Sequence, residues 1–310
     1  QGLSALGYVV LNRHMGAVFA EKLAAQRNLE IIAPAQVLAI DTAPDMASVT
    51  IDESGKQTIV TTRLLVAADG TGSNARKQLG LALRVEEYCQ SAVIANVSPA
   101  RPHNGVAYER FTTDGPVALL PLPENRCALV WTQSPEQVER TRNMDDDSFL
   151  RALEDHFGQR LGGFVRTGER QVYPLALQLA EPVTAMRSVV IGNAAHTLHP
   201  IAGQGLNLAL RDVADLAELL VNADDPGIPE LLDQYMANRQ RDVGRTVTYT
   251  DTLLRLFTNP LPLLDHARGA ALMLIDRVPP LRRLMARQGM GFAHARSRLA
   301  RGLNLKGEKA

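Results

Sequence analysis

The 310-residue sequence is poor in cysteine, and aromatic residues make up only 5% of it. Its two cysteines, Cys89 and Cys127, lie far apart and form no C-x-x-C pair. That excludes a disulfide framework or a cysteine-rich metal site and favours reduced thiols in a cytoplasmic protein. No stretch reaches the roughly 18 apolar residues that a membrane-spanning helix requires, and no signal peptide is recognisable.

The sequence also lacks an excess of either charge, with 33 basic and 33 acidic residues. This balance argues against a nucleic-acid-binding protein. The distribution is uneven, however, because residues 277–310 hold seven arginines and two lysines against the single acid Glu308. This basic region, which includes Arg282, Arg283 and Arg287, predicts either contact with an anionic membrane or acidic partner, or an ordinary solvated helix face.

Two further motifs are missing. There is no G-x-S-x-G nucleophile motif, which argues against a serine hydrolase. There is also no G-x-G-x-x-G followed by a helix, the fingerprint of a dinucleotide-binding unit, and the chain opens on Gln1.

Hydrophobic periodicity divides the chain into alternating regions. A helix is expected at 14–26, strands at 29–43 and 48–61, and a strand buried on both faces at 63–70. A β-rich stretch covers 89–132, and a helix follows the acids Asp145–Asp147 and Ser148. A second buried strand at 188–193 leads to a long helix from Gly203, and 229–303 is mostly helical. We therefore expect segments 1–87, 88–180, 181–260 and 261–310, forming two lobes with a site between them.

Residues 191–212, IGNAAHTLHPIAGQGLNLALRD, carry the most chemical information. A strand gives way to small residues, the rigid Pro200 and a glycine pair at the start of a helix. Backbone N–H groups there can approach a ligand closely, and the helix dipole favours an anion or an electron-rich ring. Few catalytic side chains are present, so a cofactor is expected to perform the chemistry. The alternatives are that the glycines only permit packing, or that His196 and His199 bind a metal, which the lack of a third ligand disfavours.

The full strings LLVAADGTGSNARKQLGL (64–81) and VVIGNAAHTLHPIAGQGLNLALRDVADLAELL (189–220) favour a more specific interpretation. In this order, and separated by a β-rich insert containing YERFTTDGPVALLPLP, they resemble the FAD-dependent aromatic-ring monooxygenases. Within this family, the sequence resembles the ubiquinone-biosynthesis branch over nearly the whole chain. Most relatives have Gly-Asp where this chain has Gly192-Asn193, and a neutral amide makes weaker, uncharged hydrogen bonds.

The resemblance implies an α/β fold: a three-layer FAD-binding domain of the aromatic-hydroxylase type, a β-rich substrate domain and a helical C-terminus. Because the G-x-G-x-x-G unit is missing, we expect an N-terminally truncated form that is inactive and binds FAD weakly or not at all. An exposed sheet edge would then favour self-association.

The resemblance also implies a reaction. NAD(P)H reduces FAD, O₂ converts it to a flavin hydroperoxide, and an oxygen atom passes to a polyprenylated phenol. Other ubiquinone-biosynthesis proteins are implied partners, and the basic region 277–310 adds the anionic surface of an inner membrane as a further expected partner. The alternatives are hydroxylation at another ring position or of a smaller phenol, and a non-catalytic scaffold.

Carried over by position, the resemblance assigns residues to FAD and to the substrate, and no metal ligand. The FAD set is Arg13, Asp69, Gly70, Gly192, Asn193, Pro200, Gly203, Gln204, Gly205, Leu206 and Asn207, with Pro200 over the flavin ring. The expected substrate wall is Phe111, Leu120, Pro121 and Trp131. Simpler roles stay open: Asp69 could cap a turn, Ser73 could cap a helix, and Arg76, Asn207 and Asp212 could be surface residues.

Overall fold

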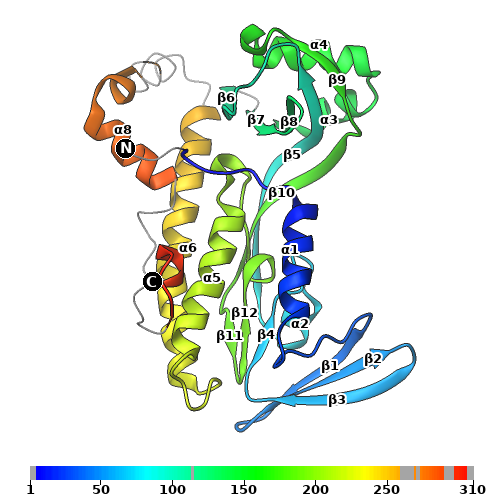
Figure 1. Ribbon diagram of the computed structural model, residues 1–310, viewed down its shortest axis with the longest axis vertical. Coiled ribbons are helices and arrows are strands. Elements are labelled where there is room, and N and C mark those ends of the chain that lie inside the picture. The colour runs from blue at the N-terminus through cyan, green and yellow to red at the C-terminus, as the bar shows by residue number, and fades with distance from the viewer. Residues whose placement is uncertain (1–4, 113–114, 259–268, 270–272, 290–296, 306–310) are drawn as a thin grey trace.

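The computed structural model describes residues 5–112, 115–258, 269, 273–289 and 297–305. They form three sheets: an antiparallel meander β1-β2-β3, a small sheet of order β11-β12-β4, and a large sheet of order β13-β10-β5-β8-β7-β6. Most of the large sheet lies at the top of Figure 1, the meander lies at the bottom, and the small sheet lies between them.

The first helix and the strands of the meander have the secondary structure that the sequence predicted. Helix α1 spans Asn12–Ala24, and the meander consists of β1 (Gln36–Thr42), β2 (Ala47–Glu53) and β3 (Lys56–Thr62). The strand expected from residue 29 begins only at Gln36, after Pro34. No residue of α1 is buried, and Phe19 on its apolar face is 53% exposed.

The small sheet joins two distant parts of the chain. Strand β4 (Leu65–Ala67) lies parallel to β12 (Ser188–Val190), which pairs on its other side with β11 (Thr184–Ala185). Strand β12 is fully buried, as predicted. The same prediction is wrong for β4, where Val66 is 39% exposed because the described residues leave one face open. In Figure 1, α5 and α6 lie on one side of this sheet and α1 and α2 on the other, which confirms the three layers.

The β-rich insert is an antiparallel sheet, as predicted. Its strands are β5 (Leu83–Pro99), β6 (Tyr108–Thr112), β7 (Gly115–Leu122), β8 (Arg126–Gln133), β9 (Phe164–Thr167) and β10 (Gln171–Ala180). Strands β5 and β10 pair from Leu83↔Ala180 to Ile94↔Gln171 and connect the insert to the small sheet. The expected division at residue 88 therefore falls inside one continuous strand.

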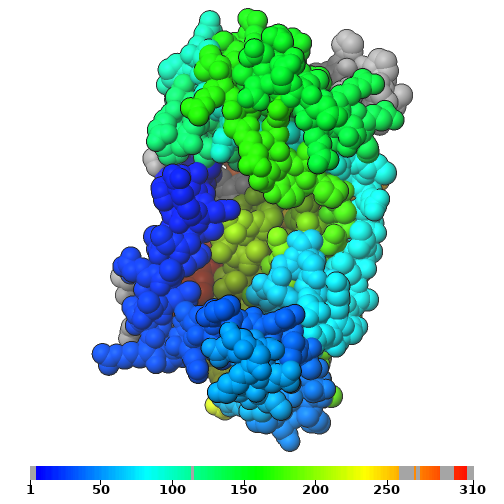
Figure 2. Space-filling view, turned by 90° about the vertical axis from the view of Figure 1, so that its right-hand side faces the viewer, coloured from blue at the N-terminus to red at the C-terminus, as the bar shows by residue number. Residues whose placement is uncertain are grey.

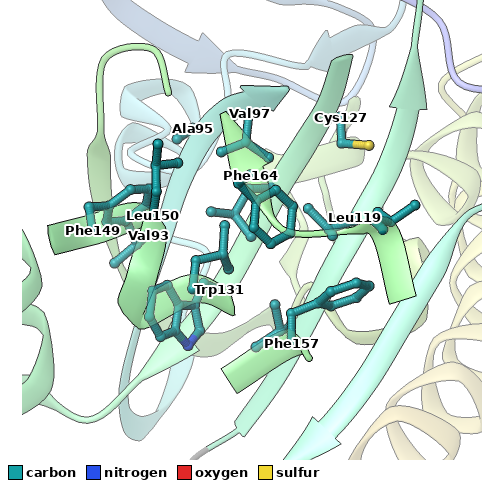
Figure 3. Packing of buried hydrophobic residues seen from close by; sticks show 14 of the residues in the cluster. Val93, Ala95, Val97, Leu119, Cys127, Trp131, Phe149, Leu150, Phe157 and Phe164 are labelled. Carbon is teal, nitrogen blue, oxygen red and sulfur yellow. The ribbon is translucent and has the colours of Figure 1, made fainter. Parts of the chain in front are cut away.

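Two helices cover one face of the insert. Helix α4 (Asp146–Phe157) begins as predicted, because Asp145 Oδ1 accepts a hydrogen bond from the Ser148 amide at 2.7 Å. Helix α3 (Pro135–Arg142) precedes it, and the short helix η1 (Gln159–Leu161) follows it. Figure 3 shows Phe149 of α4 in the core with Trp131 and Val93 of the sheet. Cys127 is buried in this core, whereas Cys89 is exposed, and both thiols are free.

The rest of the described chain is mostly helical, as predicted. It comprises α2 (Asn74–Gln78) and, after β12, η2 (Gly192–Ala194), β13 (His196–Thr197), η3 (Ile201–Gly203), α5 (Gly205–Leu220), α6 (Pro229–Thr258), α8 (Pro279–Gly289) and η4 (Leu299–Arg301). Among the described helices, none has the length and apolar character needed to cross a bilayer. Of the expected segment 261–310, only residues 269, 273–289 and 297–305 are among the described residues.

The insert core should dominate the stability of that region. Replacing Phe149, which is fully buried, with alanine should lower the free energy of unfolding by about 3–5 kcal/mol, since it removes a large side chain and leaves a cavity. Replacing Val165, which is 67% exposed on β9, with alanine should change it by less than about 0.5 kcal/mol. Urea denaturation measures both, and equal effects would contradict this description of the core.

Candidate functional site

The loop between β12 and α5 is built around left-handed backbone conformations. Gly192 and Gly203 have φ values of 59° and 58°, and Ala202 has 59°. A Cβ on Gly192 would contact Ala209 at 3.7 Å, whereas one on Gly203 or Gly205 would meet nothing within 4 Å. The contact at Gly192 is of ordinary van der Waals length, so its positive φ and not packing favours glycine there, while Gly203 and Gly205 leave the backbone open to a ligand.

The start of α5 is equally open. Its N-cap residue Gln204 makes no capping hydrogen bond through its side chain, and its Nε2 donates instead to the Ala202 carbonyl at 3.0 Å. The next turn presents Leu206, which is 56% exposed, and Asn207, also exposed. The positive end of a 16-residue helix thus lies beside an accessible surface. Figure 2 shows this side of the molecule hollowed between α1, the insert and the meander, with α5 at the bottom of the hollow.

The loop after β4 is organised by Asp69. Its carboxylate accepts hydrogen bonds from the Ser73 hydroxyl and, at 3.0 Å, from the Ala75 amide, and Ser73 in turn caps α2. Burial tends to raise the pKa of Asp69, but these hydrogen bonds outweigh it and hold the pKa below its ordinary value. Asp69 therefore does cap a turn. It shares the exposed loop with Gly70, which has a φ of 87°.

Direct hydrogen bonds bring the two loops together. The Arg76 guanidinium, only 3% exposed, donates to the Ala194 carbonyl at 3.1 Å, and the Ile191 amide donates to the Ala67 carbonyl at 3.0 Å. The expectation that Arg76 could be a surface charge is wrong, because the side chain bridges the two loops. Segments more than a hundred residues apart thereby form one site.

A buried carboxylate fixes the second loop from behind. Asp212 is 1% exposed, so the surface alternative is wrong for it too. One of its oxygens accepts the Gly192 amide at 2.8 Å and lies 2.7 Å from His196 Nε2, and the other pairs with Arg239 Nε at 2.7 Å. Burial acts to lower the pKa of Arg239, but Asp212 and Asp242 outweigh it and keep the guanidinium charged.

Both histidines of this loop are buried and make hydrogen bonds within the protein. His196 pairs with Asp212, and His199 is 1% exposed, with Nδ1 accepting from the Ile201 amide at 3.2 Å. Burial lowers the pKa of His199 to about 4, so the ring is neutral near pH 7. Within the described part of the chain there is no group of three or more histidine, cysteine or acidic side chains that could hold a metal.

The expected substrate wall divides between the two faces of the insert. Phe111 stacks on Phe257 of α6 with ring centroids 4.0 Å apart, and strand register places the half-buried Leu120 on the same face. Trp131 instead lies in the core, 6.0 Å from the Phe149 ring and 2% exposed, as Figure 3 shows. Strand alternation puts Pro121 on the Trp131 face as well, so these two residues do not join the other pair.

One residue of this junction was missed by the sequence analysis. Glu109 Oε1 accepts a hydrogen bond from the Ala202 amide at 3.3 Å, which connects β6 to the glycine loop. Strand alternation could have revealed it, since Glu109 lies two residues before Phe111 on the same face. Arg13, by contrast, lies exposed on α1.

Comparisons with known proteins identify the family of the chain. Residues 17–250 match the family model described as FAD binding domain. The chain is 39% identical over 290 residues to ubiquinone hydroxylase UbiL of Rhodospirillum rubrum, covering 92% of this chain and 67% of that protein. It is 31% identical over 298 residues to 3-demethoxyubiquinol 3-hydroxylase of Escherichia coli, covering 94% and 74%.

The chain belongs to this family of FAD-binding hydroxylases. It spans about two thirds of the length of the first of these relatives. Its fold resembles that of p-nitrophenol 4-monooxygenase PnpA from Pseudomonas putida, with a TM-score of 0.75 at 20% identity over 92% of this chain and 72% of that one. The predicted family and fold class are therefore confirmed.

The residues present fit the flavin that this family binds. The Gly203 amide donates to the Pro200 carbonyl at 3.0 Å, whereas Gly205 and the uncapped first turn of α5 present backbone N–H groups beside open space, and Asn193 is exposed on η2. A hydroxylase flavin develops negative charge when reduced, which the positive helix end would stabilise. The neutral Asn193 adds no opposing charge there.

Asp212 should make a large contribution to stability. We expect Asp212→Asn to lower the free energy of unfolding by about 3 kcal/mol, the low end for a broken buried ion pair, because Asp215 and Asp242 still neutralise Arg239. Asp233→Asn, at an exposed position of α6, should have almost no effect. Urea denaturation of the two variants tests this, and a stable Asp212→Asn protein would contradict the role given to Asp212.

Proposed function

We propose that this chain carries the flavin loop and the substrate sheet of an FAD-dependent, NAD(P)H-consuming monooxygenase of ubiquinone biosynthesis, and that without a G-x-G-x-x-G unit it binds FAD weakly and has little activity of its own. The observation that carries the proposal is the open glycine loop, held by Arg76 on one side and by Asp212 on the other. When bound, FAD would accept reducing equivalents from NAD(P)H and activate O₂ for insertion into an aromatic ring. The chain's own residues would bind and orient the flavin: Asp69 and Gly70 near the linker and ribose, Gly192 and Asn193 near the ribityl and phosphate region, and Gly203–Leu206 at the ring edge.

The substrate we propose is a polyprenylated phenol. The relatives named as ubiquinone hydroxylases support it, and the Gly192-Asn193 pair resembles that of 2-octaprenyl-6-methoxyphenol hydroxylase. Phe111 and Leu120 supply an apolar surface beside the glycine loop. The alternative is a smaller phenol or another ring position. Oxygen incorporation into prenylated and unprenylated phenols, followed by mass spectrometry, distinguishes the two.

Flavin binding gives the direct test. Because the sequence lacks a G-x-G-x-x-G unit, weak but saturable quenching of FAD fluorescence is expected. Gly203→Ala should weaken it at least about tenfold, since a Cβ at a φ of 58° strains the loop and projects toward the ligand. Gly105→Ala is the matched control, with a φ of 72°, open surroundings and a position in the insert.

Two results would contradict the proposal. Equal loss of affinity in both glycine variants would mean that backbone strain alone, and not the loop, determines binding. No saturable quenching by the unmodified chain would favour a non-catalytic scaffold among quinone-biosynthesis proteins.

We further propose peripheral contact between α8 and an anionic membrane. Arg282 and Arg283 are exposed there next to Leu284, which is 65% exposed, so the helix presents charge and apolar surface together. Replacing both arginines with glutamine should reduce co-sedimentation with phosphatidylglycerol vesicles severalfold. Replacing the exposed Arg140 and Arg142 of α3 should not, and unchanged binding in the first variant would mean that α8 is only a solvated helix.

A further inference from the structure

Ionisable side chains from three elements lie near residues 199–202 of the glycine loop, where Glu109 bonds to Ala202 and the Tyr88 ring lies 5.1 Å from that of His199. Glu109 comes from β6, Tyr249 and Asp251 come from α6, and Tyr88 comes from β5. Tyr88 is engaged, because its hydroxyl donates to Asp251 Oδ1 at 3.2 Å. Glu109 is the member of this group that lies directly against the loop assigned to the flavin.

The geometry of Glu109 leaves one oxygen available. Its Oε1 accepts the Ala202 amide at 3.3 Å, and among the described residues Oε2 has no hydrogen-bond donor. Register places Glu109 opposite Ala118 on β7, on the sheet face that carries Phe111 and Leu120. A carboxylate oxygen, an apolar surface and the backbone of the glycine loop therefore share one location.

The surroundings make this carboxylate a good acceptor for a neutral hydroxyl. Glu109 keeps an exposed part, but the neighbouring elements remove some of the water around its carboxylate, and this desolvation raises the pKa of Glu109, although the Ala202 amide partly offsets the shift. Burial and the charge of Glu109 also raise the pKa of Tyr249, which keeps its hydroxyl protonated. His199, neutral because of its burial, adds no positive charge to the loop.

We propose that Glu109 is a catalytic residue that binds the phenol hydroxyl of the substrate and accepts its proton. This inference rests on the proposed function, since it requires an aromatic substrate beside the flavin. Glu109, which lies on the insert and contacts Ala202, holds the substrate ring through the hydroxyl oxygen of that ring.

The proton passes directly from the phenol to Glu109, and no third group is needed. The phenol O–H bond breaks, an O–H bond forms on Glu109 Oε2, and the electron pair of the broken bond stays on the phenol oxygen. That pair delocalises into the ring and makes its carbon atoms more nucleophilic toward the oxygen that NAD(P)H and O₂ supply. No electron is exchanged in this step, and Glu109 returns the proton to solvent afterwards.

A chromogenic phenol can report this hydrogen bond without turnover. We would bind 4-nitrophenol to the FAD-loaded chain and record its absorption spectrum across pH, because its neutral and phenolate forms absorb differently. A carboxylate acceptor favours the neutral form, so the bound probe should ionise at a higher pH than the free probe. Glu109→Gln keeps the size of the side chain and an oxygen for Ala202, and Glu124→Gln, in the exposed turn after β7, serves as the matched control.

We expect Glu109→Gln to bind neutral 4-nitrophenol about tenfold more weakly, as for a lost hydrogen bond to a charged group, and to abolish the shift in ionisation. Substrate-dependent turnover should fall at least about a hundredfold, with FAD affinity unchanged. Glu109→Asp should restore part of the shift. The Glu124→Gln protein should behave as the unmodified chain.

The outcomes separate the two proposals. If the unmodified chain binds FAD and 4-nitrophenol but Glu109→Gln matches Glu124→Gln, the role of Glu109 is wrong and the proposed function stands. If the unmodified chain binds neither FAD nor the phenol, both are overturned.

Discussion

The structure depends most on the buried charge of Asp212. A carboxylate at 1% exposure is tolerated only because each oxygen has a strong partner: the Gly192 amide and His196 on one side and Arg239 on the other. These bonds tie the turn after β12 to α5 and α6. The open face of the glycine loop can then remain free for a ligand, because Asp212 and Arg76 hold its closed face through hydrogen bonds.

The same arrangement explains how two lobes present a single site. Strands β5 and β10 run without interruption from the small sheet into the insert, so the insert is connected by paired strands and not by a flexible linker. On one face of the insert sheet, Glu109 accepts a hydrogen bond from the glycine loop and Phe111 stacks on Phe257 of α6. The apolar surface of Phe111 and Leu120 and the glycine loop are therefore held in a fixed position relative to each other, which the transfer of oxygen from a cofactor to an aromatic substrate requires.

Local patterns predicted much of this architecture. Periodicity identified α1, the β-rich insert, the buried β12 and the helices after it, and the motifs around Asp69 and Gly203 identified the family. What local patterns could not resolve were roles set by partners distant in sequence. Arg76 and Asp212 look like surface residues until Ala194 and Arg239 are placed beside them. Trp131 was expected in the substrate wall because the alternation of a β-strand does not tell which of its faces α4 covers. Val66 was expected to be buried, but its exposure depends on neighbouring elements that the sequence of β4 does not specify.

The pairing of Leu83 with Ala180 also bears on the order of folding. The β4–β12 contact joins residues about 120 positions apart, and closing so long a loop in one step is costly in chain entropy. Once β5 and β10 have zipped together, only the short stretches from Ala67 to Leu83 and from Ala180 to Ser188 remain to be closed. The entropic cost falls by roughly 1–2 kcal/mol on this account. The insert is thus expected to fold before the flavin loop, and the cofactor site would be among the last parts of the chain to form.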